Sequence, residues 1–361
     1  MKDIKNIMLS HPGNILAKEL EQQRMSRKEL AVRTGFTEKH ISTIIGGQRN
    51  ISPSFAKKLE YALGVPLSEW LKFQNAYDEA LLEYEEQNHI SEEEFEILKP
   101  LKDILAYMNQ ISILPNGLGD VEKIVYLRRF LRISSLESVT KIPYNAAYRA
   151  QISNNATINP YVLYVWQYVC ESLATKIETN QLLDKELLKD SLPDIKKIMF
   201  VKAASIYDQL VKIFAQCGIA FHIIKHFRGA PVQGFIKTMR DGRLMMALTL
   251  RQARADIFWF SLFHEIAHVF NGDANDRFVD FSSIKSESEA KADKMARDIL
   301  IDNADYILFV KGDDFSESAI KSFAETQNVP PYIVVGRLQS DELIGWNQHT
   351  DMLIKYEWIK D

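Results

Sequence analysis

Two histidines and a glutamate lie close together in the apolar stretch Phe258–Phe270. His264 and His268 are four residues apart, so on a helix of about 3.6 residues per turn they project from one face and can bind one ion. Glu265 follows the first histidine, where its carboxylate can take a proton from a water that the ion holds. This His-Glu-x-x-His spacing is typical of zinc hydrolases. The alternative is a pair of helical histidines satisfied by hydrogen bonds, although five flanking aromatic residues favour a buried site.

A hydrolytic zinc site needs a third protein ligand and an open position for water. Downstream, the segment Ser286–Leu300 predicts a helix with Ser286 as N-cap, on which Glu289 and Asp293 are about one turn apart. We assign Glu289 as the third Zn²⁺ ligand and Asp293 as the carboxylate that orients a ligand histidine. The alternative for this pair is a solvated acidic helix start, which the helix dipole favours. The rival ligands are Glu287, Asp273 and Asp280.

The N-terminal segment carries a second, independent pattern. Ser26 and Glu29 have the spacing of a capping box, and Gly35 supplies a turn before a second short helix, Thr37–Ile45. Two short helices around a glycine turn are typical of a helix-turn-helix whose second helix enters the major groove of DNA. Arg49, in the loop that follows, is suited to the phosphate backbone. The residues left to contact DNA edges and phosphates are Thr37, Glu38, Lys39, His40, Ser42 and Thr43.

The charge distribution agrees with this placement. Residues 1–72 hold 12 Lys/Arg and 7 Asp/Glu, a net charge of +5, whereas the other 289 residues carry −9. A locally basic module favours double-stranded operator DNA as partner, because phosphate contacts drive affinity. A homodimer is expected, since helix-turn-helix proteins commonly bind symmetric sites. The alternative is a helical protein-interaction domain with a solvated basic face.

Two segments of the sequence resemble known protein families. Residues 11–77 resemble XRE-type helix-turn-helix regulators, and most closely the HigA-type antitoxin branch, in Glu29-Leu-Ala, Ile41-Ser-x-Ile44, Gly47-x-Arg49 and Leu63-Gly64. Residues of about 195–345 resemble the ImmA/IrrE family of metallopeptidases in His264-Glu-x-Ala-His, Glu289-x-x-Ala-Asp293 and Gly336-Arg-Leu-Gln339. The sequence departs from that family at Lys291 and Met295, where relatives often carry an acidic residue and Phe.

The resemblance implies a DNA-binding transcriptional regulator with a zinc-dependent endopeptidase domain that cleaves a specific protein partner or itself. It also leaves an alternative of another class, an antitoxin and autorepressor whose peptidase fold mainly senses or binds a toxin partner. For the peptidase, zinc would activate a water, Glu265 would act as base, and a further donor must stabilise the oxyanion. Three residues are candidates for that donor: Tyr332, His222 and Arg337.

Length and composition favour a mainly α, multidomain fold, because 361 residues with 46% hydrophobic content can form two or three cores. We expect an all-α helix-turn-helix module at 1–77, a helical connector domain at 78–194 and an α+β zincin-like peptidase domain at 195–361. Within the connector, residues 78–96 hold nine acidic side chains and no Lys or Arg, which indicates a solvated hinge. The strand-like run Leu244–Leu250 is a candidate edge strand for binding substrate, with an interior strand as the equal alternative.

Several classes of protein are disfavoured. No apolar stretch reaches about 18 residues and the N-terminus lacks the pattern of a signal peptide, so we expect no membrane association and a cytoplasmic location. Two cysteines, Cys170 and Cys217, lie in apolar helix-like runs and imply no disulfide framework.

Overall fold

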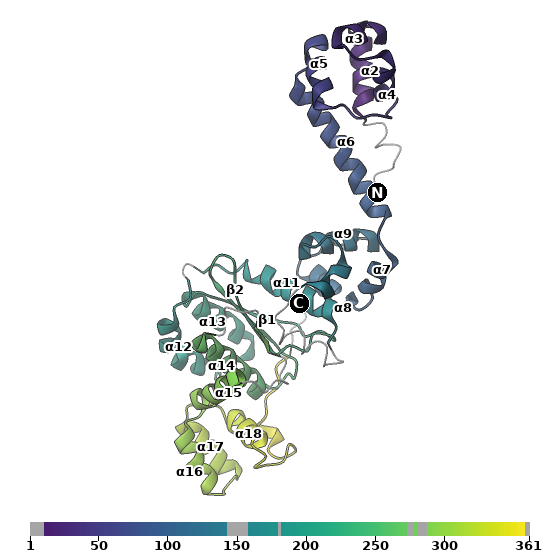
Figure 1. Cartoon of the computed structure of the whole chain (residues 1–361). Coiled ribbons are helices and arrows are strands. Elements are labelled where there is room, and N and C mark those ends of the chain that lie inside the picture. Colours follow the sequence, from purple (N-terminus) through teal and green to yellow (C-terminus); the bar gives the residue numbers. More distant parts are fainter. Residues whose placement is uncertain (1–10, 143–157, 180–181, 273–277, 281–286, 358–361) are drawn as a thin grey trace. The chain divides into compact units, whose positions relative to one another are not determined.

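The computed structural model of the chain describes residues 11–142, 158–179, 182–272, 278–280 and 287–357. They form two compact units. The first comprises the described residues up to Glu96 together with Leu118–Val125, and the second comprises Ile97–Gly117 and the described residues from Tyr126 onward. Helices dominate both units, and a small sheet lies in the second (Figure 1). The predicted class, a mainly α multidomain chain with an α+β part, is confirmed.

Five helices form most of the first unit around a shared apolar core. Their bounds are α2 Pro12–Gln22, α3 Arg27–Thr34, α4 Glu38–Ile45, α5 Pro53–Leu63 and α6 Leu67–Asn88. The Ser26 hydroxyl accepts a hydrogen bond from the Glu29 N–H at 3.0 Å and so caps α3, as the spacing predicts. Gly35 ends α3 in the left-handed conformation, with φ of 73°, which glycine adopts without steric cost. These local features set the turn between α3 and α4.

The acidic segment 78–96 is helical over most of its length. Helix α6 continues to Asn88, α7 (Glu92–Leu98) begins four residues later, and Glu94 is buried. The other side chains of this segment are exposed or half-buried, which agrees with a solvated segment, and a hinge at this place stays a prediction. Glutamate is a good helix former, and the three glutamates in the first turn of α7 suit the positive end of the helix dipole.

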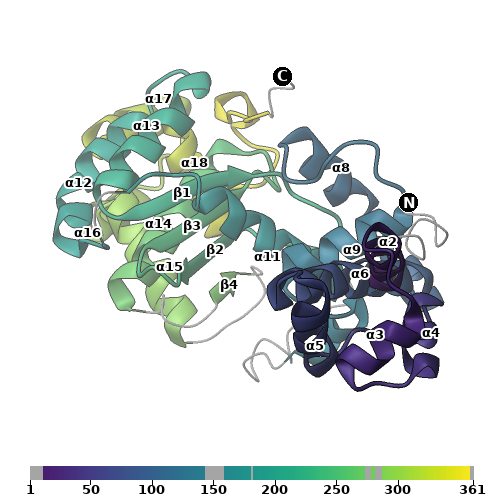
Figure 2. The ribbon, with the colours of Figure 1, turned by 90° about the horizontal axis from the view of Figure 1, so that it is seen from above.

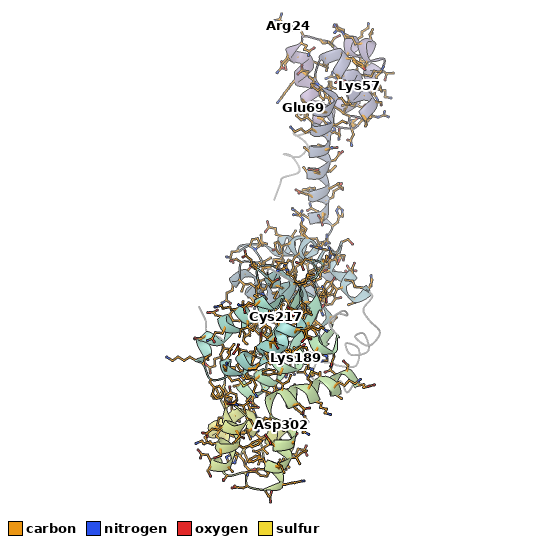
Figure 3. The ribbon with its side chains drawn as sticks, turned by 90° about the vertical axis from the view of Figure 1, so that its left-hand side faces the viewer. Arg24, Lys57, Glu69, Lys189, Cys217 and Asp302 are labelled. Carbon is orange, nitrogen blue, oxygen red and sulfur yellow. The ribbon has the colours of Figure 1, made fainter. Side chains whose placement is uncertain are left out.

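Of the remaining helices, α11, α13 and α14 pack against the sheet of the second unit (Figure 2), and α9 straddles the division between the units. Their bounds are α8 Lys102–Gln110, α9 Asp120–Leu131, η1 Leu136–Lys141, α11 Pro160–Ala174, α12 Lys185–Ile198, α13 Ala203–Gln216, α14 Ala255–Asn271, α15 Glu287–Leu300, α16 Asn303–Lys311, α17 Glu317–Thr326, α18 Pro331–Ser340 and η3 Thr350–Met352. Cys217, labelled in Figure 3, follows α13 and is a buried free thiol, as is Cys170 in α11. In the described part of the chain, no helix is both long enough and apolar enough to span a bilayer.

The sheet has the strand order β1-β3-β2-β4. β1 (Ile219–Ile224) runs parallel to β3 (Leu244–Thr249), and β2 (Gly234–Thr238) runs antiparallel to both β3 and β4 (Phe278–Asp280). Because β3 is paired on both sides, its backbone groups are already used and it is an interior strand. The prediction of an edge strand at 244–250 is thus corrected to its alternative. All six residues of β3 are buried, which suits that central position.

Candidate metal centre and DNA-binding module

Helix α14 places the His-Glu-x-x-His residues inside the second unit. The helix packs against β2, β3, α15 and α18, which is possible because it is apolar on nearly every face. His264 is 4% exposed, and Glu265 and His268 are fully buried. Three polar side chains so deep in an apolar helix need partners.

The metal-binding atoms assigned from the sequence converge in space. His264 Nε2 lies 2.9 Å from His268 Nε2 and 3.1 Å from Glu289 Oε2, and His268 Nε2 lies 3.5 Å from Glu289 Oε1. Among the described residues, these three form a group whose ligand atoms all lie within 4.8 Å of one another. Two atoms bound tetrahedrally to Zn²⁺ at about 2.1 Å are separated by about 3.4 Å. The donor set and its spacing therefore fit one zinc ion.

Asp293 has the position expected of an orienting carboxylate. Its Oδ1 lies 2.9 Å from His264 Nδ1, so the ring can donate from Nδ1 and present the Nε2 lone pair to an ion. Asp293 comes from α15, one turn after Glu289, and both project toward α14. Burial alone would raise the pKa of Glu289, but hydrogen bonds and charges from His264 and His268 outweigh it and lower this pKa to about 2.

Glu265 is held between α14 and the sheet. A Cβ atom on Gly234, the first residue of β2, would lie 1.7 Å from Glu265 Oε1, so only glycine leaves room for this carboxylate. The carboxylate is thus confined beside the ligand histidine instead of joining the group of three. The sequence alone does not indicate this close approach, because it depends on tertiary packing.

A cavity of about 390 Å³ opens at this group. Its lining includes His264, Glu289 and Asp293 together with apolar side chains from α14 and α18. The sequence did not predict this cavity, since its wall comes from three helices that are distant along the chain. A volume of this size can hold part of a peptide.

The rival ligands and the oxyanion candidates lie in different surroundings. The Glu287 side chain is 85% exposed and forms an ion pair with Lys291 at 2.7 Å. Asp273 and the N-cap candidate Ser286 lie outside the described residues, as does the side chain of Asp280. The Tyr332 hydroxyl donates to the Met199 carbonyl at 3.2 Å, and His222 Nδ1 lies 3.1 Å from the Tyr207 hydroxyl. Of the three oxyanion candidates, Arg337 lines the cavity.

We expect Glu289→Ala to lower zinc affinity far more than Glu287→Ala. The first substitution removes one of three converging ligands, whereas the second removes an exposed carboxylate paired with Lys291. Asp293→Asn should weaken zinc binding by about 10- to 100-fold, because the amide cannot orient His264 equally well. Competition with a chromogenic zinc chelator measures all three affinities. A larger loss from Glu287→Ala than from Glu289→Ala would mean that the register of α15 has been misassigned.

The predicted DNA-contacting residues lie on and after α4. Ile41 and Ile44 are buried in the core of the unit, which leaves Thr37, Glu38, Lys39 and Arg49 exposed and His40, Ser42 and Thr43 half-buried. The His40 ring stacks on Phe36 with 4.7 Å between centroids, and Arg49 donates to His40 Nδ1 at 3.3 Å. Burial and then the charge of Arg49 lower the pKa of His40. His40 therefore joins the recognition helix to the basic loop that follows it.

Comparison with known proteins identifies this module. Residues 16–70 match the helix-turn-helix family, so the N-terminal module is a DNA-binding helix-turn-helix domain of the kind found in transcription regulators. The chain is also similar to the solved structure of an addiction module antidote protein of a HigA family from Coxiella burnetii. The two are 31% identical over 22% of this chain and 94% of that chain, with a TM-score of 0.20. No curated protein matches the chain.

Proposed function

We propose that the protein is a DNA-binding transcription regulator whose second unit is a zinc-dependent endopeptidase of the ImmA/IrrE type. Its substrate would be a specific protein partner or the chain itself. One observation carries the peptidase part of the proposal: His264, His268 and Glu289 converge beside a buried Glu265 and open onto a cavity. A structural cluster of polar side chains would have no need of a cavity large enough for a peptide.

The residues have separable roles in this proposal. When bound, Zn²⁺ supplies a Lewis acid that activates water and polarises the scissile carbonyl. Glu265 accepts the proton of the attacking water and delivers it to the leaving amine. Asp293 keeps His264 in the tautomer that presents Nε2. Gly234 leaves space for the Glu265 carboxylate and thereby sets its position.

Appearance of new protein N-termini tests the peptidase activity. Zinc-loaded full-length protein and the same protein treated with a chelator are each incubated with proteins extracted from the host cell, and new N-termini are labelled and sequenced. The proposal expects a small set of termini that depend on zinc. If chelated and zinc-loaded protein yield the same termini, the second unit is not a zinc endopeptidase.

We expect Arg49→Ala to weaken binding to every DNA sequence alike. Arg49 is exposed in the loop after α4, where it can neutralise a phosphate, and loss of one phosphate contact should flatten the salt dependence of log Kd by about one unit. Thr43→Ala should instead change which sequence is preferred, because Thr43 lies on the helix expected in the major groove. Gel shifts on the promoter of the gene itself, at two salt concentrations, measure both effects.

Lys72→Ala is the charge-matched control, since Lys72 is exposed on α6, away from the α3–α4 turn in sequence. If Lys72→Ala causes the same loss as Arg49→Ala, the contribution of Arg49 is only its net charge. We propose a dimer on an inverted repeat with half-sites about one helical turn apart. No binding at low salt would make residues 1–77 a protein-interaction module.

A second candidate function is favoured by the HigA-type motifs of residues 11–77. In this alternative the protein is an antitoxin and autorepressor, and its second unit binds or senses a toxin partner without cutting it. The same DNA binding is expected, so the partner distinguishes the two functions. A partner that co-purifies intact with zinc-loaded protein, with no new N-termini, would favour the antitoxin. Disappearance of that partner over time would favour the peptidase.

A further inference from the structure

The cavity beside the proposed zinc site has a wall built from three helical faces. α14 contributes residues 256 to 264, α15 contributes residues 289 to 300 and α18 contributes residues 333 to 340. Ile257, Phe260 and Ile333 make part of this wall apolar. Polar groups with a defined position inside such a cavity determine which ligand it accepts.

Helix α15 carries a third charged residue, Arg297, on the side of Glu289 and Asp293. Glu289, Asp293 and Arg297 are spaced by four residues, so they share one helix face, and all three line the cavity. The helix rises by about 12 Å between Glu289 and Arg297. Arg297 therefore belongs to the end of the cavity away from the metal ligands, a few peptide residues from the reacting bond.

The charges at this far end do not balance. Arg254 binds Asp256 through two hydrogen bonds of 2.9 and 2.7 Å, which compensates both groups. Arg337 Nε donates to Asp341 at 2.7 Å, and the Tyr306 hydroxyl donates to the same carboxylate. Apart from the Glu289 and Asp293 carboxylates at the metal end of the cavity, three guanidinium groups, including that of Arg297, thus lie with two carboxylates, which leaves one positive charge in excess at the far end.

Arg297 carries this excess charge. Its Nη1 lies 3.6 Å from Asp341 Oδ1, which is an ion pair but too long for a hydrogen bond. Among the described residues this is the one ion pair of Arg297, and its side chain is 36% exposed. The planar guanidinium can therefore offer its donors to a ligand in the cavity. The ligand group that best matches the paired N–H donors of a guanidinium is a carboxylate.

We propose that this cavity binds a carboxylate of the peptide substrate, with Arg297 as the group that recognises it and Arg337 behind it. The inference rests on the proposed peptidase function and names the substrate class, a peptide with an acidic side chain or a free C-terminal carboxylate near the cleaved bond. Apolar contacts with Ile257, Phe260 and Ile333 hold the adjoining part of the peptide. Trp346 lies at the rim, with its ring 5.4 Å from the Arg254 guanidinium.

Calorimetric titration of short peptides tests the proposal. The probes are the tetrapeptides Ala-Ala-Glu-Ala and Ala-Ala-Gln-Ala, both acetylated and amidated, and acetylated Ala-Ala-Gln-Ala with a free C-terminus. All titrations use full-length protein with Glu265→Gln, so that no peptide is consumed. A charge-assisted hydrogen bond predicts at least about tenfold tighter binding of a carboxylate-bearing peptide than of the neutral one. The preference should shrink as salt is raised.

Variants of Arg297 test whether this residue causes the preference for a carboxylate-bearing peptide. Arg297→Gln should abolish the preference, and because Asp341 keeps Arg337 and Tyr306 as partners, this change strands no buried charge. Arg297→Lys should keep part of the preference for a carboxylate, since lysine retains the positive charge but lacks the paired N–H donors of a guanidinium. Arg240→Gln is the matched control, an exposed arginine between β2 and β3 that does not line the cavity. Equal melting temperatures of the variants show that each is folded.

The outcomes separate the two carboxylate sources. Tighter binding of the Glu peptide alone supports an acidic side chain, and tighter binding of the free C-terminus supports a terminal carboxylate. Equal affinity for all three peptides overturns the proposal, as does a preference that survives Arg297→Gln. A charge preference without any zinc-dependent cleavage would leave the cavity assignment standing and refute the peptidase. Zinc-dependent cleavage, together with peptide affinities that do not depend on Arg297, would support the peptidase and refute the cavity assignment.

Discussion

The protein with His268→Ala is expected to lose the single zinc ion that the purified wild-type chain should hold. His268 is fully buried, and its Nε2 faces both other ligands, at 2.9 Å from His264 and 3.5 Å from Glu289. An alanine leaves two ligands where a zinc site needs three protein groups and a water. Metal analysis of the purified proteins should therefore give about one zinc per chain for the wild type and nearly none for the variant.

Thermal unfolding should report the same loss. A ligand that binds only the folded state stabilises it by about 2.7 kcal/mol when present at about 100 times its Kd, so zinc should raise the melting temperature of the wild type and not that of His268→Ala. His226→Ala is the matched control, because His226 is a half-buried histidine of the same unit outside the ligand group. Equal zinc content in wild type and His268→Ala would refute the site.

The residues of the candidate metal centre could be predicted from the sequence because each pair of them is close together along the chain. Two histidines four residues apart must share a helix face, and the same spacing links Glu289 to Asp293. Each pair needs only the helix period to be placed correctly. Bringing the two pairs together depends on the packing of α14 against α15, which helix periodicity does not encode; Glu289 was assigned because a hydrolytic zinc site needs a third ligand.

The cavity could not be predicted in the same way. Arg297 continues the four-residue spacing of Glu289 and Asp293, yet nothing in the sequence indicates that α18 brings Arg337 and Asp341 to it. Partners about 40 residues apart along the chain are set by tertiary packing, which helix periodicity does not encode. The contact between Gly234 and Glu265 has the same origin.

Strand positions were predicted more reliably than strand neighbours. The apolar run at 244–250 gave the position of β3, but an interior strand and an edge strand differ only in which strands pair with them. In the acidic segment 78–96, composition correctly indicated solvent exposure but did not indicate helix α7, which the helix propensity of glutamate favours. In the helix-turn-helix, local capping by Ser26 and Gly35 decided the structure, so the pattern was sufficient.

Glu265→Gln is expected to retain zinc and to abolish cleavage. Glutamine has nearly the same shape, so it fits the space that Gly234 leaves, and Glu265 is outside the group of three ligands. Its amide cannot accept a proton from water, and loss of a general base costs about 100- to 10,000-fold in rate. The measurement pairs zinc content with the rate at which new N-termini appear.

The two readouts distinguish a base from a ligand. Loss of zinc in Glu265→Gln would mean that Glu265 binds the metal, and undiminished cleavage with zinc retained would mean that another group takes the proton. Glu265→Asp keeps a carboxylate but withdraws it by about one methylene, so this control should keep zinc and only part of the activity. His268→Ala should lose both metal and activity, whereas Glu265→Gln should lose activity alone. The pair of variants therefore tests metal binding and proton transfer separately within four residues of one helix.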